Sequence, residues 1–345
     1  MKTEISKFRK IKRKPIAASR QELITTEYLD NDKQFPLVIQ PAVKGLNLIS
    51  WSINNREFIE QQLLQHGAIL FRNCQIDSPA KFREFISASC DEALEYSYRS
   101  SPRTEVGDRI YTSTDYPADR SIFPHNENSY AATFPLRILF FCLTPAAIGG
   151  ETPIGRCRNI LKYIDRQIIE KFQQKQIMYV RNFGNGFGLS WQTVFQTTDK
   201  QKVAEYCRHN NIQWEWRKGD RLRTKQIQPA IVLHPQTKEK VWFNHAAFFH
   251  ISTLEPQIRQ ALITEFKEED FPNNTYYGDG SPLEEGVLNC LRYAYQQEMV
   301  TCSWQKGDVL LLDNMLVAHA RNPYQGCRKV LVGMAQEISH QDVLI

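Results

Sequence analysis

The sequence predicts a mixed α/β protein with a mainly β core, in which helices lie outside a β-sandwich and one long insertion interrupts it. Short runs rich in Val, Ile, Leu and Phe, bounded by Gly, Pro, Asp or Asn, are typical of strands. Other segments carry apolar residues at helical spacing. Strands and helices do not alternate regularly, and neither a GxGxxG after a strand nor a Walker sequence is present, so a nucleotide-binding fold is unsupported.

Three segments are predicted to be helical. The first ends at Gly67, ahead of an extended run over 68–71, and its apolar stripe is Phe58, Ile59, Leu63 and Leu64. The stripe of the second, a single amphipathic helix, is Ile160, Ile164, Ile168 and Phe172. The third begins at "SPLE" (281–284), with Ser281 as the N-cap, Pro282 in the first turn and Glu284 closing a capping box. Its stripe is Leu283, Val287 and Leu291.

Five runs are predicted to be strands: 137–143, 231–233, 241–243, 309–312 and 330–332. Neither an internal repeat nor a low-complexity linker divides the chain. We therefore expect a basic arm and lead-in over residues 1–50, followed by a single domain over 51–345 with an insertion at about 155–300.

Composition limits the class of protein. A chain of 345 residues with 42% hydrophobic and 11% aromatic content can bury a sizeable core and is not of the disordered class. The net charge of +5 is too mild to indicate nucleic-acid binding. Seven basic residues gather in the first fourteen positions, which is typical of a solvated terminus; contact with an acidic partner is the alternative.

The expected location is the cytoplasm. The N-terminus has no apolar core of a secretory signal, and no run of 18 apolar residues would span a membrane. The eight cysteines are scattered and form no CxxC pair, as expected for buried thiols in a reducing compartment.

The segment "HNE" suggests a metal site. In an extended segment, side chains two residues apart point to the same side, so His125 and Glu127 can converge on one ion while Asn126 faces away. Taken alone, such a pair is more typical of an exposed loop in which the His and Glu are incidental, so the pair needs a third ligand. Two histidines and one carboxylate on one face of an octahedron form the ligand set of non-haem Fe(II) oxygenases, so a second histidine is needed.

His319 is the preferred third ligand. It lies near the end of "GDVLLLDNMLVAHARNP", where it follows a turn, a buried strand and a polar corner. His245 and His250 lie in an aromatic segment and could instead be packed or line a pocket. Nine residues after His319, Arg328 opens "RKVLVGM", where its planar guanidinium could pair with a buried carboxylate. Lys329 is a rival if the strand register slips by one residue.

Several motifs together resemble a known family. "HNE", "GGETPI", "GDVLLLDNMLVAHAR" and "GCRKVLVGM" resemble the taurine catabolism dioxygenase (TauD/TfdA) family of Fe(II)- and 2-oxoglutarate-dependent enzymes. "LSWQTVFQT", "VWFNHAAFFH" and "YGDGSPLE" resemble its branch typified by the syringomycin-biosynthesis hydroxylase. The resemblance runs from about Gly67 to Met334 and implies a double-stranded β-helix, or jelly roll, with flanking helices.

The resemblance also implies residue roles. His125, Glu127 and His319 would bind Fe(II), with 2-oxoglutarate and O2 as co-substrates. Arg328 would pair with the far carboxylate of 2-oxoglutarate, and Thr152, 25 residues after Glu127, would hydrogen-bond the same group. The alternative for Thr152 is an ordinary turn hydroxyl after two glycines.

Two departures from the family pattern bear on the reaction. Glu127 stands where Asp is commonest, and because it fills the carboxylate position, hydroxylation is favoured over chlorination. The arginine that grips taurine's sulfonate has no counterpart, so taurine is not the expected substrate. Desaturation and cyclisation stay open, since they use the same oxidant.

The expected substrate is an amino acid or an amino-acid-derived compound of secondary metabolism, free or tethered to a peptidyl carrier domain. The polar groups predicted for its pocket are Asn128, Ser129, Asn244, His245 and Arg321. Two other classes were weighed: a barrel that only binds a small molecule, and a nucleic-acid or chromatin oxygenase. Because the chain shows no stripe of alternating basic and aromatic residues, the second is unsupported, and neither nucleic acid nor membrane is an expected partner.

Overall fold

The computed structural model describes residues 23–96, 98, 101–184 and 186–344. Residues 1–22, which contain the predicted basic arm, lie outside the described residues. The described residues of the lead-in contribute two strands to the main sheet. Of the described helices, none is long and apolar enough to cross a membrane.

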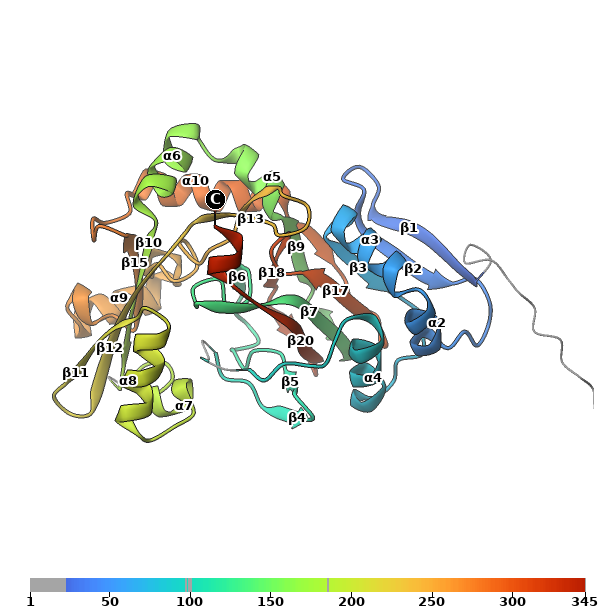
Figure 1. Cartoon of the computed structure of the whole chain (residues 1–345), viewed down its shortest axis with the longest axis horizontal. Coiled ribbons are helices and arrows are strands. Elements are labelled where there is room, and N and C mark those ends of the chain that lie inside the picture. The colour runs from blue at the N-terminus through green and yellow to red at the C-terminus, as the bar shows by residue number, and fades with distance from the viewer. Residues whose placement is uncertain (1–22, 97, 99–100, 185, 345) are drawn as a thin grey trace, which may run out of the picture.

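The core is a large sheet of eight described strands (Figure 1). In spatial order they are β1 (Ile24–Asp30), β2 (Phe35–Pro41), β3 (Ala68–Phe71), β17 (Val309–Asp313), β7 (Thr133–Thr144), β20 (Lys329–Ser339), β5 (Ile110–Thr112) and β4 (Glu105–Gly107). Neighbours run antiparallel apart from β2 and β3, which are parallel. Three of the five predicted strands are β7, β17 and β20, and the extended run predicted over 68–71 is β3, which confirms those predictions.

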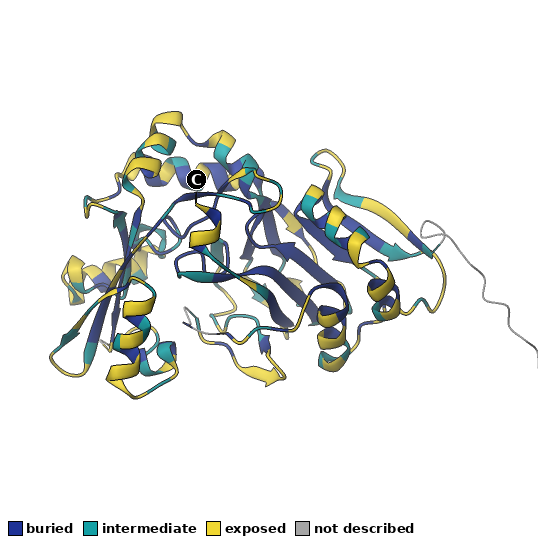
Figure 2. Cartoon of the chain, viewed as in Figure 1, coloured by how far each residue is buried: buried dark blue, intermediate teal, exposed yellow. Residues whose placement is uncertain are grey.

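The two faces of this sheet are buried against different partners, because alternate residues of a strand point to opposite sides. On one face Leu139 and Phe141 pack with helices α2 (Leu48–Asn54), α3 (Arg56–His66) and α4 (Pro79–Ser89). On the other face Ile138 and Phe140 belong to the central core. Figure 2 shows these strands as the continuous buried part of the molecule.

A smaller antiparallel sheet lies against the central core and carries the region of interest. Its order is β16 (Val300–Cys302), β9 (Thr152–Arg156), β18 (Val317–Arg321) and β6 (Ile122–His125). The mixed α/β prediction with a mainly β core is confirmed. A short pair, β8 (Ile148–Gly149) with β19 (Tyr324–Gln325), and the turn η4 (His340–Val343) complete the core region.

Between β9 and β16 the chain forms a separate layer with its own sheet, ordered β11, β12, β10, β15. The strands are β10 (Ile177–Phe183), β11 (Gln213–Arg217), β12 (Arg221–Gln228), β15 (Asn273–Tyr277) and the hairpin β13 (Ile231–Leu233) with β14 (Lys240–Trp242). The helices are α5 (Cys157–Ile160), η1 (Leu161–Tyr163), α6 (Arg166–Lys175), α7 (Trp191–Phe195), α8 (Lys200–His209), η2 (Ile251–Thr253), α9 (Pro256–Glu265), η3 (Glu268–Asp270) and α10 (Glu285–Glu298). The hairpin contains the remaining two predicted strands.

The end of the first predicted helix is confirmed at Gly67, which caps α3 with a left-handed φ of 80°. A Cβ there would also approach Val317 Cγ2 to 2.7 Å, so a larger residue would push the helix end away from β18.

The second predicted helix is wrong as a single element. Ile164 is extended, and the Asp165 side chain accepts from the backbone N–H of Gln167 to cap a new helix, so the segment divides into α5, η1 and α6. Ile160 and Phe172 of the predicted apolar stripe are buried, as expected. The segment nevertheless holds two α-helices, because Asp165 caps the start of the second.

The third predicted helix begins later than expected. Its N-cap is Glu284, without a side-chain cap bond, and the helix starts at Glu285. Ser281 Oγ donates instead to Asp279, and the Glu284 carboxylate accepts from the Tyr277 hydroxyl and pairs with Lys171. The predicted capping residues are therefore engaged by other partners.

Candidate metal centre

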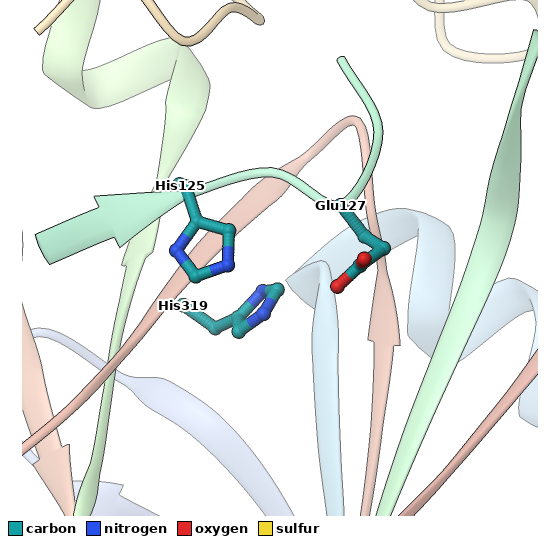
Figure 3. Close-up of side chains that lie close together, drawn as sticks. All are labelled: His125, Glu127 and His319. Carbon is teal, nitrogen blue, oxygen red and sulfur yellow. The ribbon is translucent and has the colours of Figure 1, made fainter. Parts of the chain in front are cut away.

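Two neighbouring strands of the small sheet bring three ligand-type side chains together. His125 is the last residue of β6 and is paired in register with His319 of β18. Glu127 follows in the turn after β6. One nitrogen or oxygen from each residue lies within 4.8 Å of the others, and Figure 3 shows the three side chains pointing toward one another.

The histidines are prepared to act as neutral ligands. Nδ1 of His125 donates to the Phe123 carbonyl at 2.8 Å, which leaves the lone pair on Nε2. Burial lowers the pKa of His125, and burial together with His125 holds the pKa of His319 well below its usual range. Within the described residues, Nδ1 of His319 is buried without a hydrogen-bond partner.

Asn314, in the turn between β17 and β18, holds the backbone of Glu127. The Glu127 N–H donates to Asn314 Oδ1 at 2.7 Å, and Asn314 Nδ2 donates to the carbonyls of Glu127 at 2.9 Å and Pro135 at 2.8 Å. Asn126, as expected, does not join the group, because its amide donates to the carbonyls of Asn314 and Val317. The sequence shows a polar corner at this position but carries no signal for its contact with Glu127.

Arg103 is a second residue that the sequence analysis missed. Its Nη2 lies 2.6 Å from Glu127 Oε2, and both side chains are only 3% exposed. Arg103 stands in the coil before β4, and it is the pairing of β4 with β5 at the edge of the large sheet that places this coil near the centre. No motif spacing relates it to "HNE", so the sequence carried no signal for it.

A cavity next to the two histidines is also lined by Thr152 and Arg328. Thr152 Oγ1 accepts from Trp304 Nε1 at 3.0 Å, so the hydroxyl hydrogen stays available to donate. Arg328 Nε donates to the Gly150 carbonyl at 2.8 Å, and Nη1 lies 3.3 Å from Ser113 Oγ. Burial and the neighbouring Arg321 lower the pKa of Arg328 to about 10, a pKa that still leaves it a cation at neutral pH. The rival Lys329 is exposed.

Of the residues predicted for the substrate pocket, Ser129 and His245 lie together near the histidine pair. Ser129 Oγ and His245 Nδ1 are 2.6 Å apart, and the His245 ring centroid is 5.6 Å from that of His125. Burial holds the pKa of His245 well below its usual range, so the ring is neutral. Phe248 stacks on the His125 ring at 4.5 Å and makes this side apolar.

The other three predicted pocket residues form hydrogen bonds within the protein. Asn128 lines a separate crevice and accepts from the Tyr130 hydroxyl at 3.5 Å. Asn244 is used within its own turn, donating to the Ala230 carbonyl and accepting from the Ala246 N–H. Arg321 lines the cavity, but its guanidinium nitrogens donate to the carbonyls of Tyr116, Pro117 and Arg120.

The remaining histidines do not join the metal-type group found among the described residues. His234 is buried and contacts Asp313, which pairs with Arg137. His340 is buried, and its Nε2 lies 3.0 Å from the Ser129 carbonyl.

A large, mainly antiparallel sheet and a smaller antiparallel sheet surround one core, and two histidines and one carboxylate meet at the edge of the smaller sheet. This arrangement defines the class of non-haem iron oxygenases. A family model described as "Taurine catabolism dioxygenase TauD, TfdA family" matches residues 31–335, and the chain belongs to that family. It is accordingly an Fe(II)- and 2-oxoglutarate-dependent dioxygenase with a double-stranded β-helix fold, as the sequence predicted.

Two relatives match most of the chain. The chain is 39% identical over 280 residues to the dapdiamide synthesis protein DdaC of Enterobacter agglomerans, covering 81% of this chain and 85% of that protein. It is 28% identical over 323 residues to a clavaminate synthase-like protein of Arabidopsis thaliana, covering 88% and 94% of the two chains.

Solved structures share the fold. PvcB of Pseudomonas aeruginosa superimposes with a TM-score of 0.56 at 12% identity, covering 95% of this chain and 96% of its own. Another PvcB structure is described as an Fe, alpha-ketoglutarate dependent oxygenase from an isonitrile synthetic pathway, with a TM-score of 0.55. AAD-2 in complex with Mn(II) and N-oxalylglycine matches with a TM-score of 0.51 at 12% identity, covering 90% and 96% of the two chains.

Proposed function

We propose that this enzyme hydroxylates an aliphatic C–H bond of an amino acid or an amino-acid-derived compound of secondary metabolism. The observation that carries the proposal is the 39% identity to a protein named for dapdiamide synthesis, in a chain with a complete two-histidine, one-carboxylate set. The likeness of three segments to the syringomycin-biosynthesis branch supports the same substrate class. A cytoplasmic location is part of the proposal, since all eight cysteines are free thiols.

The proposed iron ligands are His125, Glu127 and His319, whose donor set fits Fe(II): two neutral imidazoles and one carboxylate, leaving positions for other ligands. Iron with 2-oxoglutarate and O2 supplies the oxidant for the C–H bond, and 2-oxoglutarate leaves as succinate and CO2. The Arg328 guanidinium and the Thr152 hydroxyl would bind the far carboxylate of 2-oxoglutarate from the wall of the same cavity.

The substrate would lie on the side formed by Ser129, His245 and Phe248. A neutral imidazole held by the Ser129 hydroxyl can orient a polar group of the substrate, while the Phe248 ring excludes water from the histidine pair. For Asn128, Asn244 and Arg321, the hydrogen bonds described above support a structural role.

The test is substrate-stimulated succinate formation with Fe(II), 2-oxoglutarate and O2, over a panel of amino acids supplied free and as thioesters on a carrier domain. We expect a product one oxygen atom heavier than the substrate, with that atom drawn largely from ¹⁸O2, and no chlorinated product in high chloride. A product lacking two hydrogens would assign desaturation instead. Turnover of taurine would contradict the proposed substrate class.

A further inference from the structure

Arg103 has more hydrogen-bonding capacity than its known contact uses. It lines the cavity that His125, His319, Thr152 and Arg328 share, and its side chain is 3% exposed. Nη2 bonds the Glu127 carboxylate, but Nε and Nη1 are buried and find no hydrogen-bond partner in the part of the chain that the structure describes. One face of the guanidinium packs on the Tyr96 ring, 4.8 Å from its centroid.

Burying such an arginine costs folding free energy unless acceptors bind its remaining N–H groups. A guanidinium carries five N–H donors, and burying donors of a cation without acceptors loses their hydration without replacing it. Nε and Nη1 lie on different edges of the planar guanidinium, so each can donate a separate charge-assisted hydrogen bond, and an anionic carboxylate is the acceptor that also balances the cation. The missing partner of Arg103 is therefore best supplied by a carboxylate that enters the cavity.

The two other arginines of the cavity are already engaged. Arg321 donates to three backbone carbonyls, and Arg328 is the proposed partner of the far carboxylate of 2-oxoglutarate, whose near end binds the metal.

We infer that Arg103 binds a free carboxylate of the substrate beside the iron while it holds Glu127. The inference rests on the proposed function and narrows its substrate class. A carboxylate converted to a carrier thioester has lost its charge and cannot accept charge-assisted hydrogen bonds from Arg103, so the substrate would be a free acid rather than one tethered through that group. Arg103 would thereby bind the anionic group of the substrate. The chain has no counterpart of the arginine that binds the sulfonate of taurine.

The test compares acids with amides by calorimetry on anaerobic protein loaded with Mn(II) and 2-oxoglutarate. The probes are the free L-amino acids and their C-terminal amides, with the same amino acids as carrier thioesters. We expect the best free acid to bind about 10- to 100-fold more tightly than its amide. In Arg103→Gln this difference should vanish, Arg103→Lys should restore part of it, and Arg83→Gln, which changes an exposed arginine paired with Asp108, should match wild type.

Four results would overturn the inference: equal binding of acid and amide to the wild type, binding of carrier thioesters in preference to free acids, equal weakening of 2-oxoglutarate and amino acid in Arg103→Gln, or loss of Mn(II) alone in that variant. Equal weakening of 2-oxoglutarate and amino acid would indicate that Arg103 binds the co-substrate. Loss of Mn(II) alone would indicate that Arg103 only positions Glu127. Slow succinate formation by the wild type without any amino acid tests the oxygenase activity separately. The proposed function would therefore remain supported even if the comparison of acids with amides contradicted the role of Arg103.

Discussion

At the scale of single residues, each proposed iron ligand is held by a contact of its own. His125 is oriented by the Phe123 carbonyl, Glu127 by Arg103 and Asn314, and His319 by its place between β9 and β6. Ligands held by such contacts keep their rotamers when a metal is exchanged, which favours a fixed geometry over a flexible one.

Replacing any of the three with alanine should remove the metal. For His125→Ala, Glu127→Ala and His319→Ala we expect Fe(II) content to fall from about one per chain to near zero and succinate formation to be lost, with the circular dichroism spectrum retained. Metal analysis after gel filtration measures this. His245→Ala is the matched control and should keep its iron; loss of iron there, with retention in His319→Ala, would reassign the third ligand.

The loss of 2-oxoglutarate affinity should be larger in Arg328→Ala than in Thr152→Ala. Arg328→Ala leaves a buried carboxylate without its charged partner, which costs about 2–5 kcal/mol and weakens binding on the order of a hundredfold or more. Thr152→Ala removes one hydroxyl donor and should cost less, about 1.5–3 kcal/mol. Anaerobic titration of the Fe(II) protein with 2-oxoglutarate gives both values. Unchanged affinity in Arg328→Ala would remove the basis for this assignment.

At the scale of elements, the centre depends on one junction between two turns. Asn314 follows β17, and its amide ties the turn before β18 to the turn after β6 through Glu127 and to the start of β7 through Pro135. These bonds hold the carboxylate ligand on one turn at a set distance from the histidine on the next strand.

Asn314→Ala should loosen this junction. Three backbone groups would be left buried without partners, at about 1–3 kcal/mol each if none finds another partner, so we expect a clear loss in the free energy of unfolding and weaker Mn(II) binding. Urea denaturation and metal titration measure the two effects. Asn322→Ala, which removes one part-buried contact with Glu151 away from the junction, is the control. Wild-type metal affinity in Asn314→Ala would show that the junction does not position Glu127.

At the scale of the whole molecule, the chain end closes onto the core through His340. Its ring lies 5.0 Å from the Phe134 ring and 5.8 Å from the Phe243 ring, and Nε2 donates to the Ser129 carbonyl. The contact joins η4, the start of β7, the segment after β14 and the turn that carries Glu127. Burial lowers the pKa of His340 to about 4.

This burial predicts a loss of stability in mild acid. Because the folded-state pKa lies below the ordinary value near 6.5, the unfolded chain binds more protons between the two pKa values. The contribution is therefore complete above pH 6.5 and is lost as pH falls toward 4, with a slope of up to about 1.4 kcal/mol per pH unit. Urea denaturation from pH 7 to 4.5 should show a smaller slope in His340→Phe than in wild type or in His209→Asn, a change at an exposed position of α8. Equal slopes would contradict the assignment.

The sequence by itself determined the features that depend on near neighbours in the chain. Alternation predicted that His125 and Glu127 share a side, helical spacing and Gly67 marked the end of α3, and apolar runs located the core strands. These signals are local because side-chain period and turn chemistry act over a few residues. The same reasoning failed where a side chain acted otherwise than expected: Asp165 caps a new helix inside the predicted one, and Ser281 donates to Asp279 instead of capping a helix.

Only the tertiary structure decided which distant residues serve the centre. Arg103 meets Glu127, Trp304 meets Thr152 and Asn314 meets Glu127 across 24, 152 and 187 positions of the chain. No periodic pattern relates such positions, because their distance depends on which strands pair and in what register. The same pairing places His319 opposite His125, so the ligand that the motif proposed reaches its place only through the sheet.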